Sequence, residues 1–325
     1  MSIYKKIIYT CFLSFLFITP AEFSFAQNTK LSTWQQTNFS EALIDINNVV
    51  SICDKDHIQS IETPSFMPAS EEKYVPKSEP VISLNINGVA RAYPLRFLLW
   101  HEVVNDTIGG VPVAITYSPF SNTSIVFDRT LNNEVLDFGV SGELYFSNTL
   151  LYDKKTESWW QQYTGQAVAG QMKGNNLQVI NSRVESFAVF KKRFPKGQIL
   201  MPYDFTKPYG TTPYPVYDSF FPFLYKGSAY AGKLSPMTYV VVAEGKAWPL
   251  DFIMNYGKIE ADDLRIAWTP VQNSVLDAAE ILLGKDLGNI GVQKKTDSGE
   301  YVDIPYKITF AFVYDAFEHG TIHGE

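Results

Sequence analysis

The sequence predicts an α+β fold that is β-rich, with mostly antiparallel sheets from an internally duplicated unit and a few short helices. Apolar runs are broken at turn dipeptides such as Asn87-Gly88, a strong short-range signal for a β-hairpin. The segment 91–95 (RAYPL) returns as 246–250 (KAWPL), and 113–119 (VAITYSP) returns as 264–270 (LRIAWTP). Two matched motifs in the same order indicate an internal repeat.

Residues 1–26 are expected to be a cleaved export signal. Lys5 and Lys6 precede an apolar run at 7–18, and Ser24-Phe25-Ala26 fits a small-x-small cleavage site. The run is shorter than the ~20 residues that cross a bilayer. We therefore expect cleavage near Ala26 and a periplasmic or secreted mature chain without a transmembrane span. A retained membrane anchor is the alternative.

The composition is that of a globular, core-forming chain, because 46% of the residues are hydrophobic and 15% are aromatic. The net charge of −7 argues against a nucleic-acid partner, which requires a basic surface. After signal removal Cys53 is the remaining cysteine, so the mature chain cannot form an internal disulfide.

Residues 27–80 are expected to form an N-terminal adapter, since they are polar and interrupted by prolines. Residues 81–202 form the predicted first β-rich repeat. A short helix is expected at 94–101, because proline suits the first helical turn. The predicted strands lie at 81–86, 89–93, 111–117, 124–128, 134–140 and 144–152, and their turns lie at Asn87-Gly88, Gly109-Gly110, Asn132-Asn133 and Ser141-Gly142.

A capped helix is expected at the end of the first repeat. The run 182–185 (SRVE) has the pattern of a capping box, which would open the helix. Phe187, Phe190 and Phe194 would share one face, and Pro195 would end the helix.

Residues 203–236 form an aromatic and proline-rich connecting loop without a period of 2 or 3.6. They would either wall a ligand pocket or pin a long loop to the domain through their own aromatic side chains. Residues 237–325 form the second, shorter β-rich repeat. It is expected to contain a helix ended by Gly257, a hairpin around Asp297-Ser298-Gly299 and a buried strand at 308–314.

The first repeat is the expected location of the functional site. It carries His101, Glu102 and Asp106, whereas the second repeat has lost the histidine. A neutral imidazole is the usual general base near pH 7, so His101 is the candidate base, with Glu102 or Asp106 as its partner. The alternative is a structural histidine at the end of a short helix.

Further polar or aromatic side chains are candidates for ligand binding. Asn105, Tyr117, Ser118, Ser121 and Asn122 follow these residues in the first repeat, and Arg129, Glu157 and Trp159 are possible pocket residues further along it. The loop 117–124 has the composition of a nucleophile loop but lacks the G-x-S-x-G elbow, and a polar turn is the alternative. A metal set of His101 and His323 would suit Zn or Cu, if the C-terminal tail folds back. Exposed tail histidines are the alternative.

Several motifs resemble those of a bacterial family of unknown function, DUF3179, over about residues 60–323. They are AYPL…WHEVVNDTIGGVPV at 92–113, IVFDR at 125–129, FGVSG at 138–142, YD…TESWWQQ at 152–162, RVESF at 183–187, PYG at 208–210 and HGTIH at 319–323. The resemblance carries no established biochemistry. Many members similar to this chain have Y-C-P-x-C where Ser118 and Ser121 stand here. A cysteine pair there would imply a soft-metal or thiol redox site, which serines cannot form.

Two classes of function therefore remain. The first is an exported ligand- or metal-binding protein of the cell envelope, with its site in the first repeat and a lost thiol or metal site. The bound partner would be a small molecule or a metal ion. The second is a hydrolase or transferase that uses His101 as the general base with Glu102 or Asp106.

Overall fold

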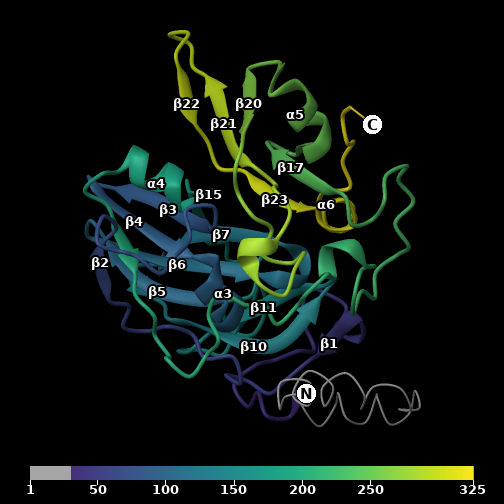
Figure 1. Cartoon of the computed structure of the whole chain (residues 1–325). Helices are drawn as coiled ribbons and strands as arrows, with labels where there is room; N and C mark the ends of the chain where they lie inside the picture. The colour runs from purple at the N-terminus through teal and green to yellow at the C-terminus, as the bar shows by residue number, and fades with distance from the viewer. Residues whose placement is uncertain (1–30, 325) are drawn as a thin grey trace, which may run out of the picture.

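The computed structural model describes residues 31–324, which form five sheets of three to five strands and one two-stranded hairpin. The five sheets are arranged like the blades of a five-bladed propeller. In Figure 1 the blue and teal strands of the first half lie below the green and yellow strands of the second half. Within the described residues the paired strands are antiparallel except β4 with β16, and the helices are short. The predicted β-rich, mostly antiparallel class is confirmed.

One sheet is built around the predicted hairpin at Asn87-Gly88. Both turn residues have positive φ, 51° and 81°, as a tight hairpin turn requires. The strands, in sheet order, are β15 (Arg183–Ser186), β3 (Pro80–Ile86), β4 (Val89–Pro94), β16 (Gln198–Leu200) and β2 (Phe66–Pro68).

The next sheet follows helix α3 (Leu95–His101), which begins after Pro94 as expected. Gly109-Gly110 turns strand β5 into β6, and the short helix η2 (Pro119–Ser121) turns β6 into β7. The strands, in order, are β14 (Gln178–Ile180), β7 (Thr123–Asp128), β6 (Val111–Ser118) and β5 (Val103–Ile108).

The third sheet corrects one predicted turn. Ser141-Gly142 does not end a strand but forms an irregularity inside β10, and the chain turns at Phe146-Ser147. A side chain at Gly142 would overlap the Cys53 carbonyl, so the glycine permits the close approach of residues 52–54. The strands, in order, are β1 (Val49–Ser51), β10 (Phe138–Tyr145), β11 (Asn148–Asp153), β12 (Trp159–Gln161) and β13 (Gln166–Ala169); β8 (Thr130–Leu131) and β9 (Glu134–Val135) form the small hairpin.

The second half contains two sheets and the hairpin expected around Ser298-Gly299. One sheet has the order β18 (Lys246–Pro249), β17 (Tyr239–Ala243) and β23 (Lys307–Phe310). The other has the order β19 (Lys258–Ala261), β20 (Leu264–Thr269), β21 (Asn289–Lys295) and β22 (Tyr301–Asp303).

The order hairpin, seven-residue helix, hairpin occurs twice. The first unit comprises β3, β4, α3, β5 and β6, and the second comprises β17, β18, α5 (Leu250–Tyr256), β19 and β20. Both helices follow a proline, and both end at a residue with positive φ, Glu102 and Gly257. The recurring sequence motifs therefore correspond to recurring structure.

Two predicted helix and strand boundaries are wrong. The capping-box pattern at 182–185 falls largely in strand β15, which pairs with β3, and helix α4 (Phe187–Arg193) begins after it without a side-chain cap. The expected strand at 308–314 is strand only to Phe310, and helix α6 (Ala311–Glu318) follows. A short, continuous apolar run fits a buried helix as well as a strand, so periodicity alone could not separate them.

The core is shared by the two halves. One buried cluster contains Leu95 and Tyr117 from the first unit together with Leu250 and Ile266 from the second.

Residues 31–80, expected to be an adapter, supply β1 and β2 to two of the sheets. Residues 203–236 contain the short helix η3 (Tyr217–Ser219) and no strand. Among residues 31–324 no helix is long and apolar enough to cross a membrane. The expected export signal lies outside the described residues.

Candidate functional site

His101 ends helix α3 and is held on both ring nitrogens. Its Nδ1 lies 2.7 Å from the Gln59 carbonyl, and its Nε2 lies 2.6 Å from the Tyr209 hydroxyl. A carbonyl can only accept, so Nδ1 carries the proton and Nε2 accepts from Tyr209. Burial lowers the pKa of His101, which favours this neutral form. The candidate base is thus covered by the aromatic loop.

Glu102 follows His101 in the sequence but shares none of the hydrogen-bond partners of His101. Thr149 Oγ1 donates to its Oε2 at 2.9 Å, and Thr149 Oγ1 also lies 3.1 Å from Ser118 Oγ. The side chain is fully buried, and this burial raises its pKa to about 7. Its φ of 56° with ψ of −31° is a conformation that L side chains rarely adopt. A strained residue that buries a titratable group is a common feature of functional sites.

The two serines lie in a buried hydrogen-bond network. Ser118 Oγ accepts from the Thr149 amide at 3.0 Å, and Ser121 Oγ accepts from Asn148 at 2.8 Å. Asn148 in turn donates to Gln162 at 2.8 Å. No sequence signal distinguishes Asn148 or Thr149 from ordinary turn and strand residues, and Gln162 stands out only as the last residue of the WWQQ motif. These hydrogen bonds show that both serine hydroxyls serve as buried hydrogen-bonding groups.

Asp106 is an ion-pair residue and is not joined to His101. Its Oδ2 lies 2.6 Å from Arg91 Nη1 and also accepts from the Tyr93 hydroxyl. The Thr107 amide donates to Oδ1 at 2.7 Å. The hydrogen bonds of His101, Glu102 and Asp106 therefore lead to three separate sets of partners.

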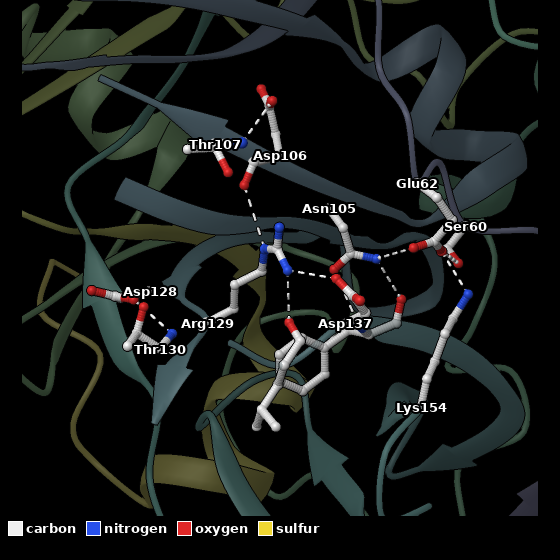
Figure 2. A network of polar contacts seen from close by, with 12 residues as sticks. Ser60, Glu62, Asn105, Asp106, Thr107, Asp128, Arg129, Thr130, Asp137 and Lys154 are labelled. Atoms are coloured by element: carbon white, nitrogen blue, oxygen red, sulfur yellow. Dashed lines mark hydrogen bonds and ion pairs between the residues drawn. The ribbon is translucent and has the colours of Figure 1, made fainter. Parts of the chain in front are cut away.

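Asn105 and Arg129 connect sheets, as Figure 2 shows. Asn105 exchanges two hydrogen bonds with the backbone of Phe138, at 2.8 and 3.0 Å, and also donates to Glu62 at 3.2 Å. Arg129 donates to Asp137 at 2.5 Å and to the Leu136 carbonyl at 3.0 Å. These contacts satisfy backbone groups, which is a structural role.

Three further candidates lie apart from this region. Glu157 pairs with Lys55 at 2.5 Å, and Trp159 packs edge-on against Trp34 with ring centroids 5.3 Å apart. The ring of His323 stacks on Trp248, and its amide donates to the Ala247 carbonyl, so its contacts differ from those of His101. Among residues 31–324 no group of three or more His, Cys, Asp or Glu side chains is placed to hold a metal ion.

Tyr117 and Asn122 line a small cavity where the two halves meet, here called the seam cavity. The Tyr117 hydroxyl donates to Asn122 Oδ1 at 3.0 Å. The cavity has a volume of about 20 Å³, which is room for one water-sized group. Its lining comes from both halves of the chain: Pro80, Leu95, Tyr117, Asn122, Ser124, Val184, Leu250, Gln272, Asn273, Val275, Leu287 and Ile308.

Gln272 and Asn273 give the seam cavity its polar character, and sequence reasoning did not select them. Gln272 Oε1 and Asn273 Oδ1 are buried and have no hydrogen-bond partner among residues 31–324. Asn273 Nδ2 donates to the Gly284 carbonyl at 2.7 Å. Because a carbonyl can only accept, this atom must be the amide nitrogen, and the unpartnered atom is the amide oxygen. The available signal is that Asn273 and Asn122 each stand three residues after the end of the repeated motif.

Asp218, from the aromatic loop, was also missed. Its side chain is fully buried, and its Oδ2 accepts from the Tyr239 hydroxyl at 2.8 Å and from the Ser274 hydroxyl at 2.9 Å. Lys285 Nζ lies 3.2 Å from the same oxygen. This cluster fastens the loop to the second unit beside the seam cavity, so the loop is pinned by a carboxylate as well as by aromatic packing.

A second, larger cavity of about 150 Å³ lies between β7 and the β17–β23 sheet. The polar side chains that line it include Ser124, Glu244, and the ion pair between Lys307 and Glu318 at 2.8 Å. None of the candidate site residues from the sequence lines it.

The fold and these contacts define a propeller-like β protein with a small cavity, lined in part by polar side chains, where two similarly built units meet. The chain belongs to the family described as "Protein of unknown function (DUF3179)", whose model matches residues 55–321. The family resemblance drawn from the sequence motifs is thereby confirmed. No curated protein and no solved structure matches the chain.

Proposed function

We propose that this chain is an exported protein of the cell envelope that binds a small polar ligand in the seam cavity. The observation that carries the proposal is the pair of unpartnered oxygens, Gln272 Oε1 and Asn273 Oδ1, on residues that line the cavity. A buried acceptor without a partner costs about 1–3 kcal/mol. A ligand with hydrogen-bond donors would remove that cost for both oxygens at once.

The site would be composed of loops from both units. We infer that the units arose by internal duplication, since Leu95 and Leu250 follow equivalent prolines and both line the cavity. Asn122 and Asn273 each stand three residues after the end of the repeated motif, at Pro119 and Pro270, and line the same cavity. The expected site in the first repeat is thus extended by its counterpart in the second.

The proposal is tested by thermal unfolding of the wild type and of Gln272→Met, which removes one unpartnered oxygen at similar volume. Small donor molecules, namely ammonium, methylammonium, formamide and methanol, are added one at a time. At least one should raise the melting temperature of the wild type but not of Gln272→Met. The control Gln178→Met changes an exposed glutamine and should respond like the wild type. If no compound discriminates between wild type and Gln272→Met, the ligand proposal is wrong.

An acid–base enzyme is the second candidate, and one observation favours it. Glu102 combines a strained backbone with a buried carboxyl whose pKa is near 7, the range suited to proton transfer at neutral pH. His101 is the weaker candidate base, because its ring nitrogens are taken up by Gln59 and Tyr209. A hydrolase or transferase screen would support this candidate if an activity is found and is lost in Glu102→Gln.

A lost thiol or metal site remains part of the proposal. Ser118 and Ser121 stand where many similar chains carry a cysteine pair, and both hydroxyls are buried within one network. Replacing both serines by cysteine, as described in the Discussion, tests the lost thiol or metal site separately from ligand binding in the seam cavity.

A further inference from the structure

Three of the polar side chains that line the seam cavity, Tyr117, Asn122 and Asn273, already donate hydrogen bonds to other groups of the protein. The Tyr117 hydroxyl donates to Asn122 Oδ1 at 3.0 Å, and Asn122 Nδ2 donates to the Ile308 carbonyl at 3.3 Å. Asn273 Nδ2 donates to the carbonyls of Leu282 and Gly284, at 3.3 and 2.7 Å. Gln272 Oε1 and Asn273 Oδ1 are the buried atoms of the lining that have no hydrogen-bond partner among residues 31–324. Two unpartnered acceptors in a lining that is otherwise largely apolar select a ligand that donates hydrogen bonds.

The charge around the cavity is also suited to a cation. Burial raises the pKa of Tyr117, and the neighbouring side chains of Tyr214, Asp218 and Glu102 raise it further. Lys285 balances Asp218 at 3.2 Å, but 42% of its side chain is exposed, so water screens its charge. The buried Asp218 carboxyl is therefore the charged group near the cavity that would favour a cation.

The size of the cavity limits what it can hold. About 20 Å³ accommodates one water-sized group, which matches an ammonium group, so any carbon substituent of an amine would have to lie outside the cavity. A water molecule can donate two hydrogen bonds and carries no net charge. An ammonium group donates more hydrogen bonds and carries a charge that the buried Asp218 carboxyl favours.

We propose that the seam cavity binds an ammonium ion or the protonated amino group of a small primary amine, held by the oxygens of Gln272, Asn273, Asn122 and Tyr117. This inference rests on the proposed function, for which it names the ligand class. Free ammonium and the amino group of a primary amine both offer N–H donors and a positive charge. They differ because the amine also carries a carbon substituent.

The test is a titration of the full-length protein followed by NMR of the Asn273 side-chain amide and by thermal unfolding. Ammonium chloride, methylammonium chloride, potassium chloride and sodium chloride are added at equal ionic strength, and formamide serves as an uncharged donor. Ammonium should shift the Asn273 signal and raise the melting temperature, whereas potassium and sodium should not. A response to methylammonium as well would identify an amine head group, and its absence would identify free ammonium.

Gln272→Met should weaken the apparent ammonium affinity by about tenfold or more, as expected for loss of a hydrogen bond to a charged group. Gln178→Met should leave this affinity unchanged.

If Gln272→Met does not fold, the NMR titration of the wild type decides the inference by itself. A response to formamide alone would overturn the cation inference and leave the proposed function standing. Equal responses to potassium and ammonium would overturn the N–H donor inference. No response in any arm would mean that the cavity holds water only, and both proposals would be wrong.

Discussion

Glu102 stands at the position that Gly257 occupies in the second unit, and the two backbones have nearly the same conformation. Their φ and ψ values are 56° and −31° for Glu102, and 68° and −34° for Gly257. Glycine adopts this conformation without steric cost, whereas a glutamate is strained in it. The first unit thus carries a buried carboxyl at a point where the fold itself favours glycine.

The pH dependence of stability should report on Glu102. Its pKa is raised by burial from 4.5 to about 7 in the folded chain, so between these values the folded chain retains a proton that the unfolded chain has released. Its contribution to stability is fully present below pH 4.5 and is lost as the pH rises to about 7. The loss is about 3 kcal/mol. Urea unfolding at several pH values should show this component in the wild type and in the exposed control Glu300→Gln, and Glu102→Gln should lack it.

The His101 imidazole should be neutral with its proton on Nδ1. Nitrogen NMR of the imidazole would show this tautomer directly, and a proton on Nε2 would contradict the assigned hydrogen bonds. Because burial lowers the pKa of His101 in the folded chain, its contribution to stability is present above the ordinary value of 6.5 and is lost as the pH falls below it.

Tyr209→Phe should leave the buried Nε2 of His101 without its donor. We expect a loss of about 1–2 kcal/mol in the free energy of unfolding, together with a changed Nε2 chemical shift. Tyr256→Phe, at an exposed ring, is the matched control and should change neither quantity. A Tyr209→Phe protein as stable as the wild type would mean that this hydrogen bond does not hold the loop.

Asp218 should anchor the aromatic loop. Asp218→Asn removes a charged acceptor shared by Tyr239, Ser274 and Lys285, which we expect to cost about 2–3 kcal/mol. Limited proteolysis should then cut residues 203–236 faster than in the wild type. Asp251→Asn changes an exposed acid of the second unit and should alter neither stability nor cleavage.

Replacing Ser118 and Ser121 together by cysteine should create a soft-metal site and weaken the buried network. Thiols are poor hydrogen-bonding groups, so a loss of about 1–3 kcal/mol per position is expected in chemical unfolding. Copper bound per protein, measured under reducing conditions, should rise above the wild-type value and above that of the surface control Ser298→Cys. A copper content equal to that of the wild type would contradict the proposal of a lost metal site.

The sequence by itself determined the local parts of this fold. Asn87-Gly88 fixed the first hairpin, and Pro94 with Pro249 placed two helix starts, because turn and cap positions restrict φ and ψ within a few residues. The repeated motifs also identified the two units in order. The helix at 187–193 and the end of β23 were misplaced, since strand pairing with β3 and burial on all sides override local patterns.

The partners of the polar side chains were decided only by the tertiary structure. His101, Glu102 and Asp106 are close in sequence, yet they face Tyr209, Thr149 and Arg91 respectively. Neighbouring positions on a helix end and a strand point in different directions, so closeness in sequence does not bring side chains together. The seam cavity forms because the packing of two units brings Asn122 and Asn273 to its wall from opposite halves of the chain. A contact between such distant residues depends on how the sheets pack, which local sequence rules do not encode.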